Sequence, residues 1–202
     1  MSHTITSIAE LEALYGEVSE ASLRKETDRI IPVYRALIEA APFVALATRG
    51  PDGLDCSPRG DGPGFIRVRD DRTLLLPDRR GNNRIDSLRN ILRDPRVALL
   101  FLIPGVGETL RVNGRAGISA APDLLQSFEV QGKLPRSVLV VTAEAVFFQC
   151  SRAIVRSKLW DPVARTRRPV PSAGDMLAGL DGSFDGNAYD AALPERVRQT
   201  LY

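Results

Sequence analysis

Histidine and cysteine are scarce in this chain of 202 residues. The single histidine, His3, lies close to the N-terminus. Catalytic triads that need an imidazole base, and metal sites built from several histidines, are therefore excluded. The two cysteines, Cys56 and Cys150, are far apart and form no Cys-x-x-Cys motif. This pattern favours a reducing compartment over a disulfide scaffold or a zinc site, and we expect both cysteines to be buried small side chains in strands.

Long apolar runs are also absent. The longest apolar stretch, 97–104, has eight residues, whereas a membrane helix needs roughly 20. The N-terminus has no basic region followed by an apolar run, so no signal peptide is predicted. We therefore expect a cytoplasmic protein that does not associate with membranes.

The overall composition is that of one ordinary globular domain, with 44% apolar and 26% charged residues. A net charge of +2 favours no class of partner. The basic residues, however, comprise 24 arginines and only three lysines. Arginine suits bidentate recognition of phosphate and carboxylate groups, although a compositional bias across the source genome would produce the same ratio.

The first 41 residues have apolar side chains at helical spacing. Segments 7–15 and 19–41 each predict an amphipathic helix, and Pro42 ends the second. From there to residue 150 the pattern changes to short strands separated by turns, with short helices between them. Strands are expected at 43–48, 54–57, 65–69, 73–77, 96–103, 109–119 and 137–150, and helices at 84–93 and 121–128, with a turn or short helix at 152–160.

This order of elements predicts a mainly β fold with flanking helices (α+β). Roughly six strands with interspersed short helices indicate an antiparallel β-barrel, either closed or split. We expect a single domain over 1–202, with a helical segment at 1–41, the barrel at 42–160 and an extension at 161–202. Because the extension is rich in proline and glycine, it is predicted to be loop-rich before a last helix at 194–201.

Half of the arginines, 12 of 24, lie between Arg59 and Arg115, a stretch with only seven acidic residues. Two dense groups stand out: 57–61 at a strand end, and 78–84, where a loop leads into a helix. A phosphate at the second group would gain the free amides of the helix N-terminus as well as guanidinium contacts. The alternative is a solvated turn in which asparagine and arginine merely cap the helix.

Other ligand classes have less support. A nucleic-acid surface is not expected, because the arginine-rich region lacks interleaved aromatic residues and the whole chain is nearly neutral. The pairs Gly62-Pro63-Gly64 and Gly105-Val106-Gly107 lack the third glycine of a dinucleotide-binding motif. No Gly-x-Ser-x-Gly nucleophile motif is present.

Four motifs occur together in a recognisable order. They are Ser-Pro-Arg-Gly-Asp at 57–61, Leu-Pro-Asp-Arg-Arg-Gly-Asn-Asn-Arg at 76–84, two strand sequences within 100–116, and Arg-Ser-Lys-Leu-Trp-Asp-Pro at 156–162. Over residues 42–162 the chain closely resembles the pyridoxamine 5'-phosphate oxidase-related, probable FMN-dependent family of split-barrel proteins. The resemblance implies a six-stranded split barrel, a homodimer, and FMN bound in two clefts at the subunit interface.

By position, the resemblance assigns nine cofactor-binding residues and no catalytic or metal-binding residue. Arg59, Asn83 and Arg84 would lie near the FMN phosphate. Ser57 and Leu76 would border the ribityl chain and ring, and Arg111 would reach the isoalloxazine. Arg156, Ser157 and Trp160 would close the site from the C-terminal segment, contributed by the other subunit. From the residues alone, a tryptophan beside a proline is more often a packing anchor.

Two departures from the true oxidase narrow the function. Its phosphate-binding Arg-Lys pair appears here as Asn83-Arg84, and its Arg-x-His group, which grips the substrate phosphate, has no counterpart near the C-terminus. These departures argue against vitamin B6 oxidation but not against flavin binding. We predict an FMN-dependent oxidoreductase that acts on an unidentified small molecule. A non-catalytic flavin-binding or sensing protein is the alternative, and a deazaflavin stays open as the cofactor.

Overall fold

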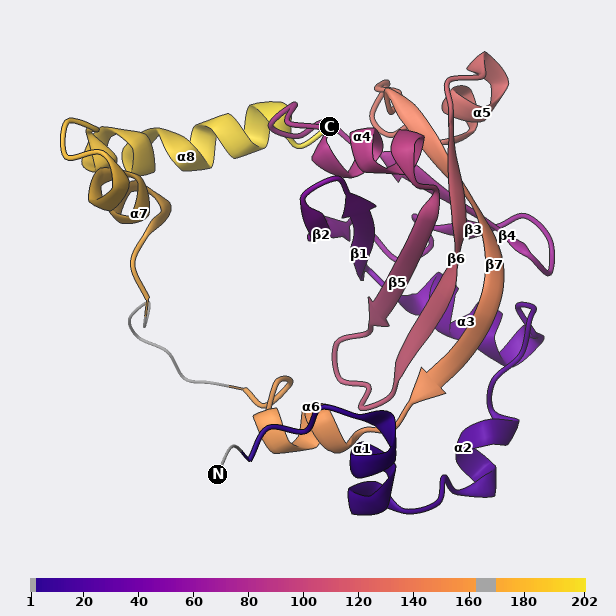
Figure 1. The fold of residues 1–202 in the computed structure, drawn as a ribbon. Coiled ribbons are helices and arrows are strands. Elements are labelled where there is room, and N and C mark those ends of the chain that lie inside the picture. Colours follow the sequence, from indigo (N-terminus) through magenta and orange to yellow (C-terminus); the bar gives the residue numbers. More distant parts are fainter. Residues whose placement is uncertain (1–2, 163–169) are drawn as a thin grey trace.

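The computed structural model describes residues 3–162 and 170–202. Its centre is a curved antiparallel sheet of seven strands in the order β2-β1-β5-β6-β7-β4-β3 (Figure 1). The strands are β1 (Phe43–Gly50), β2 (Gly53–Gly60), β3 (Arg67–Val68), β4 (Thr73–Asp78), β5 (Arg96–Leu102), β6 (Thr109–Ser119) and β7 (Ser137–Gln149). Because the edge strands β2 and β3 do not pair with each other, the barrel is split.

The predicted class, mainly β with flanking helices, is confirmed. The barrel count of six is one too low, because seven strands are present. Each of the seven segments predicted as strands overlaps one of them. The segment predicted at 65–69 is the least accurate, since only the two residues of β3 within it pair, with Leu75 and Leu74 of β4.

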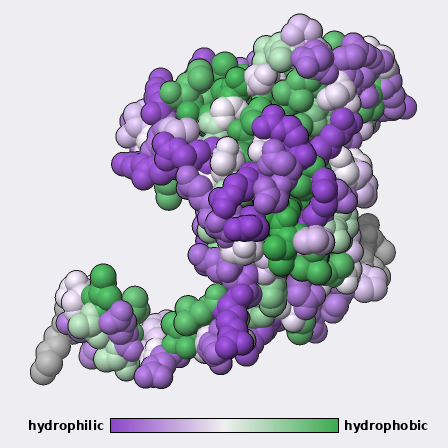
Figure 2. Space-filling view, turned by 90° about the vertical axis from the view of Figure 1, so that its right-hand side faces the viewer, coloured by the Kyte–Doolittle hydropathy of each residue, from purple (hydrophilic) through white to green (hydrophobic). Residues whose placement is uncertain are grey.

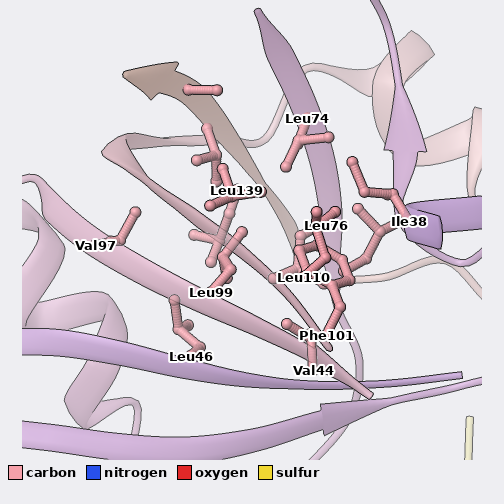
Figure 3. Packing of buried hydrophobic residues seen from close by; sticks show 14 of the residues in the cluster. Ile38, Val44, Leu46, Leu74, Leu76, Val97, Leu99, Phe101, Leu110 and Leu139 are labelled. Atoms are coloured by element: carbon pink, nitrogen blue, oxygen red, sulfur yellow. The ribbon is translucent and has the colours of Figure 1, made fainter. Parts of the chain in front are cut away.

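Alternate side chains of the strands fill the barrel interior. The register places Val44 opposite Phe101, and Leu46 opposite Leu99, so apolar residues of neighbouring strands face the same side. Figure 3 shows this core, to which helix α3 contributes Ile38. Its largest fully buried side chains include Phe101, Ile38, Leu46, Leu74, Leu76, Leu99, Leu110 and Leu139.

The described residues form eight helices. They are α1 (Ile8–Tyr15), α2 (Glu20–Arg24), α3 (Pro32–Ala40), α4 (Asp86–Arg93), α5 (Pro122–Ser127), α6 (Arg152–Ser157), α7 (Ala173–Leu180) and α8 (Gly186–Thr200). Of these, α7 and α8 pack against each other and stand apart from the sheet (Figure 1). Helix α4 lies across one end of β1 and β2, and α6 lies at the other end of the sheet (Figure 1). Polar and apolar residues are interspersed on the face shown in Figure 2.

The single helix predicted for 19–41 is wrong. Two helices, α2 and α3, replace it, because Thr27 leaves the helical path to exchange backbone hydrogen bonds with Val146 of β7, at 3.0 and 2.7 Å. Pro32 then starts α3 at its first position, where the missing N–H costs nothing.

The loop-rich extension before residue 194 is also a wrong prediction for the described part, 170–202. Ser172 and Asp175 form a capping box that starts α7, and Asp185 caps the start of α8. Pro194 lies inside α8 rather than at its beginning. The prolines and glycines of this segment suggested loops, but the helix caps at Ser172 and Asp185 outweigh them.

The two cysteines are exposed, contrary to the expectation of buried side chains. Cys56 is on the outer side of the edge strand β2, and Cys150 follows the last residue of β7. An edge strand and a strand end have fewer neighbours to cover a side chain than a central strand, which accounts for the error.

Gly114 lies where the register between β6 and β7 shifts by one residue. A Cβ atom added there would stand 2.0 Å from the carbonyl oxygen of Thr142, whereas one at Gly117, on the same strand, would meet nothing within 4 Å. We expect Gly114→Ala to reduce the free energy of unfolding by about 1–3 kcal/mol or more. Gly117→Ala is the matched control and should be neutral or stabilising by up to about 1 kcal/mol. Equal effects of both substitutions in urea unfolding would contradict this packing.

Candidate functional site

A cleft of about 690 Å³ opens between the end of β2, the loop after β4 and the beginning of α4. This volume lies within the usual range of small-molecule sites, roughly 300–1,000 Å³. The cleft is lined by Asp55, Ser57, Pro58, Arg59, Gly60, Phe65, Pro77, Asp78, Arg79, Arg80, Gly81, Asn82, Asn83, Arg84, Ile85, Asp86, Ser87, Leu88 and Arg136. Five arginines and three aspartates are among them, so the cleft carries a positive balance.

The loop that enters α4 has an unusual backbone. Asn83 and Ile85, with φ of 61° and 53°, are both in the left-handed region that favours glycine. Such conformations cost about 1 kcal/mol or more and occur often at functional sites. Ile85 is the N-cap of α4 and provides no side-chain hydrogen bond. The N–H groups of the first helical turn are thus left without a side-chain cap beside the cleft, where an anion is favoured.

Arg84 projects between these two strained residues. Its Nε donates to Asp86 Oδ2 at 2.8 Å, and its side chain remains 76% exposed. Because this ion pair is solvated, it contributes little to stability. The guanidinium therefore keeps further donors for a ligand.

A chain of hydrogen bonds joins the two walls of the cleft. On β2, Arg59 Nη1 donates to Ser57 Oγ at 2.9 Å, and Ser57 Oγ lies 2.9 Å from Ser87 Oγ of α4. Ser87 in turn donates to Asp55 Oδ2 at 3.0 Å. Since Ser87 is buried, this chain holds the guanidinium of Arg59 at a defined distance from the first turn of α4.

Asp78 and Arg136 line the cleft next to the loop that leads from β4 into α4. Arg136 Nη1 donates to Asn83 Oδ1 at 3.0 Å, which supports the left-handed Asn83. Burial raises the pKa of the Asp78 carboxyl above its ordinary value, and the positive charges of Arg59 and Arg136 only partly oppose this shift.

Asp61 fixes the beginning of the loop after β4 through its contact with Arg79. It accepts hydrogen bonds from Arg79 Nε at 2.9 Å and from the Tyr202 hydroxyl at 2.7 Å. Arg79 also donates to the carbonyl oxygen of Phe128 at 2.7 Å. Both members of the Asp61–Arg79 pair are largely buried, with side chains 9% and 16% exposed. Arg79 therefore holds the loop in place, while its neighbours along the loop face the cleft.

Four of the nine predicted cofactor-binding residues line this cleft: Ser57, Arg59, Asn83 and Arg84. Three further residues that line the cleft, Ser87, Asp78 and Arg136, were not predicted as cofactor-binding residues. Asp78 belongs to the arginine-rich motif and was open to recognition. Ser87 comes from α4, and Arg136 from the residue before β7, so only the tertiary structure brings them to the cleft.

The other five predicted residues lie elsewhere in the chain. Leu76 is 1% exposed and belongs to the hydrophobic core. Arg111 lies over the ring of Phe147, 4.8 Å from its centroid, on the outer face of the sheet. Trp160 donates its indole N–H to the carbonyl oxygen of Val106 at 2.7 Å. Arg156 and Ser157 are exposed on α6, at the end of the sheet opposite α4 (Figure 1).

Comparison with known proteins identifies the family. The family described as "Pyridoxamine 5'-phosphate oxidase" matches residues 30–150, more than half of the chain. The chain belongs to this family. The match includes β1 to β7 and the whole lining of the cleft, and the split barrel is the fold of its members. No curated protein matches the chain.

Several solved structures resemble it at low identity. HupZ from Group A Streptococcus is 18% identical over 60% of this chain and 95% of that chain, with a TM-score of 0.49. A putative pyridoxamine 5'-phosphate oxidase from Lactobacillus delbrueckii is 23% identical over 60% and 95%, with a TM-score of 0.47. An FMN-binding protein from Syntrophomonas wolfei is 13% identical over 56% and 82%, with a TM-score of 0.44.

Two further features concern only residues 3–162 and 170–202. No helix there is long and apolar enough to cross a membrane. No group of three or more histidine, cysteine, aspartate or glutamate side chains is arranged there to hold a metal ion.

The Asp61 anchor predicts a specific pH dependence. Burial acts to raise the pKa of Asp61, but hydrogen bonds from Tyr202, the Gly62 N–H and Arg79 outweigh it, so the pKa lies below its ordinary value of 3.8. A lowered pKa gives stability that is present above that value and is lost as the pH falls through the folded-state pKa.

We expect Asp61→Asn to reduce the free energy of unfolding by about 1–3 kcal/mol at pH 7. In urea titrations, the difference from the wild type should shrink between pH 5 and pH 2. Asp52→Asn, at an exposed turn, is the control and should show no such trend. A difference that stays constant for Asp61→Asn over this range would contradict the anchor.

Proposed function

We propose that the protein binds FMN in the cleft, with the phosphate at the first turn of α4, and acts as an FMN-dependent oxidoreductase on a small molecule. The observation that carries this proposal is the uncapped start of α4, faced by the guanidinium groups of Arg59, Arg84 and Arg136 in a chain of this family. The identity of the substrate is left open.

The residues of the cleft fit this cofactor. A phosphate dianion requires several positive groups and N–H donors, which the arginines and the first turn of α4 supply. The hydroxyl of Ser57 offers a partner for a ribityl hydroxyl. Phe65, Pro77 and Leu88 give part of the lining an apolar character that suits a flavin. The solvated-turn alternative explains neither the two left-handed residues nor the chain of hydrogen bonds between the walls.

The protein's own contribution is to bind and orient. FMN, when bound, supplies the electron-transfer chemistry, and the protein supplies position and electrostatics. Ser57 holds Arg59 by a hydrogen bond, and Arg136 holds Asn83, so the groups that meet the phosphate are positioned before the ligand arrives. Since the flavin itself accepts and donates the electrons, the scarcity of histidine is no obstacle.

We also propose that a second copy of the chain completes the site. Arg156, Ser157 and Trp160 do not line the cleft of their own chain, and α6, which carries the first two, lies at the end of the sheet opposite α4 (Figure 1). If these residues contact the cofactor, they do so in the cleft of a neighbouring copy. The outer face of the sheet carries apolar side chains beside arginines, among them Leu100, which is 37% exposed, and its cross-strand partner Arg111. Two-fold association is a common way to cover such a face.

A flavin-binding or sensing protein without turnover is the second candidate. Apart from arginines, the titratable side chains that line the cleft are all aspartates. So small a choice of groups for proton transfer favours a protein that binds flavin without turnover. Anaerobic reoxidation of the photoreduced, FMN-loaded protein by candidate acceptors separates the two, because a pure binding protein accelerates none of them over free FMN.

Arg84→Ala and Arg59→Ala test the phosphate contacts. Each removes a charge-assisted hydrogen bond of about 1.5–3 kcal/mol, so the dissociation constant for FMN should rise by about one to two decades. Binding of riboflavin, which has no phosphate, should not change. Arg24→Ala on α2, at a side chain 78% exposed, removes the same charge outside the cleft and is the control. Normal FMN affinity in both cleft variants, measured by fluorescence quenching, would assign these arginines to solvated turns.

Sedimentation equilibrium tests the proposed dimer. The wild type at micromolar concentration should have twice the chain mass of 22.1 kDa. Leu100→Glu places a charge on the outer face and should produce monomers. The control is Val33→Glu on α3, at a side chain 64% exposed, which should remain dimeric. A wild type that is monomeric with FMN bound would refute the shared site.

A further inference from the structure

A second, smaller cavity of about 190 Å³ adjoins the cleft. We call it the annex, and it is lined by Arg79, Arg80, Lys133, Leu134, Arg136 and Tyr202. Arg79, Arg80 and Arg136 also line the cleft. The two cavities therefore adjoin each other at these three arginines. One extended ligand, or two small ligands side by side, could occupy them together.

The charge of the annex differs from that of the cleft. The cleft includes three aspartates, whereas no acidic residue lines the annex. Asp61 neutralises Arg79. Arg80 and Lys133 form no ion pair within residues 3–162 and 170–202, and Arg136 donates to an amide oxygen, that of Asn83. With Arg80 and Lys133 outside any ion pair in the described residues, the annex carries an excess of positive charge, which is the environment an anion requires.

The walls of the annex are fixed by main-chain and buried contacts. Val130 and Lys133 exchange backbone hydrogen bonds of 3.0 and 2.9 Å across a tight turn, whose central residues, Gln131 and Gly132, have φ of 52° and 74°. This left-handed pair is typical of the tightest hairpin turns and holds Lys133 at one place. On the opposite wall, Tyr202 is held by its hydroxyl bond to Asp61.

We propose that the annex is a second anion subsite, which binds a phosphate or carboxylate group next to the phosphate held in the cleft. The proposal rests on the proposed FMN site and extends it. The anionic group has two sources. It belongs either to a cofactor that continues beyond the flavin phosphate, as in a flavin dinucleotide, or to a separate anionic molecule that binds beside FMN.

Calorimetric titrations of the full chain distinguish these sources. The first compares FMN with flavin adenine dinucleotide on the cofactor-free protein. The second adds inorganic pyrophosphate to the protein saturated with FMN. Both are repeated with Lys133→Ala, and with Lys133→Arg, which retains the charge. Arg24→Ala on α2 again controls for the loss of one positive charge elsewhere.

We expect Lys133→Ala to leave the FMN affinity within about twofold, since Lys133 does not line the cleft. For an extended cofactor, the affinity for the dinucleotide should fall by about five- to tenfold; for a separate anion, pyrophosphate binding should fall by the same factor. Lys133→Arg should restore either loss. Normal FMN binding with no effect of Lys133→Ala on either ligand would overturn the annex alone. Absence of FMN binding to the wild type would overturn the proposed function and the annex together.

Discussion

The docking of helix α4 against the β1–β2 hairpin is the interaction on which the site depends. Buried Asn90 donates its side-chain amide to Thr48 Oγ1 at 3.1 Å, and Ile91 enters the core. A Cβ atom at Gly50 would stand 2.6 Å from Asn90 Oδ1, so this close approach needs glycine. Together with the hydrogen bond between Ser57 and Ser87, these contacts fix the first turn of α4 opposite Arg59. A helix start held so firmly gives an anion a preorganised site.

The sequence predicted the elements with strong local signals and failed where distant contacts decide. Alternating apolar residues located β1, β5, β6 and β7 to within a few positions. The break between α2 and α3 depends on Thr27 pairing with Val146, more than a hundred residues away, and no local pattern contains that information. The start of α7 was open to prediction, because Ser172 and Asp175 have the spacing of a capping box.

The same division applies to the site. The motif around Arg84 and the strand end at Arg59 were recognisable, because residues that are close in sequence form each of them. The roles of Ser87 and Arg136 depend on the folded barrel, which brings β2, α4 and the residue before β7 to one cleft. Trp160 is a different case, since it does not line the cleft of its own chain and instead donates its indole N–H to the carbonyl oxygen of Val106.

A crystal structure of the protein in complex with FMN tests the central claim most directly. The account predicts the phosphate within hydrogen-bond distance, about 2.7–3.2 Å, of first-turn N–H groups of α4 and of the guanidinium groups of Arg59 or Arg84. Electron density that places the phosphate away from α4, or the flavin outside the cleft, would contradict it.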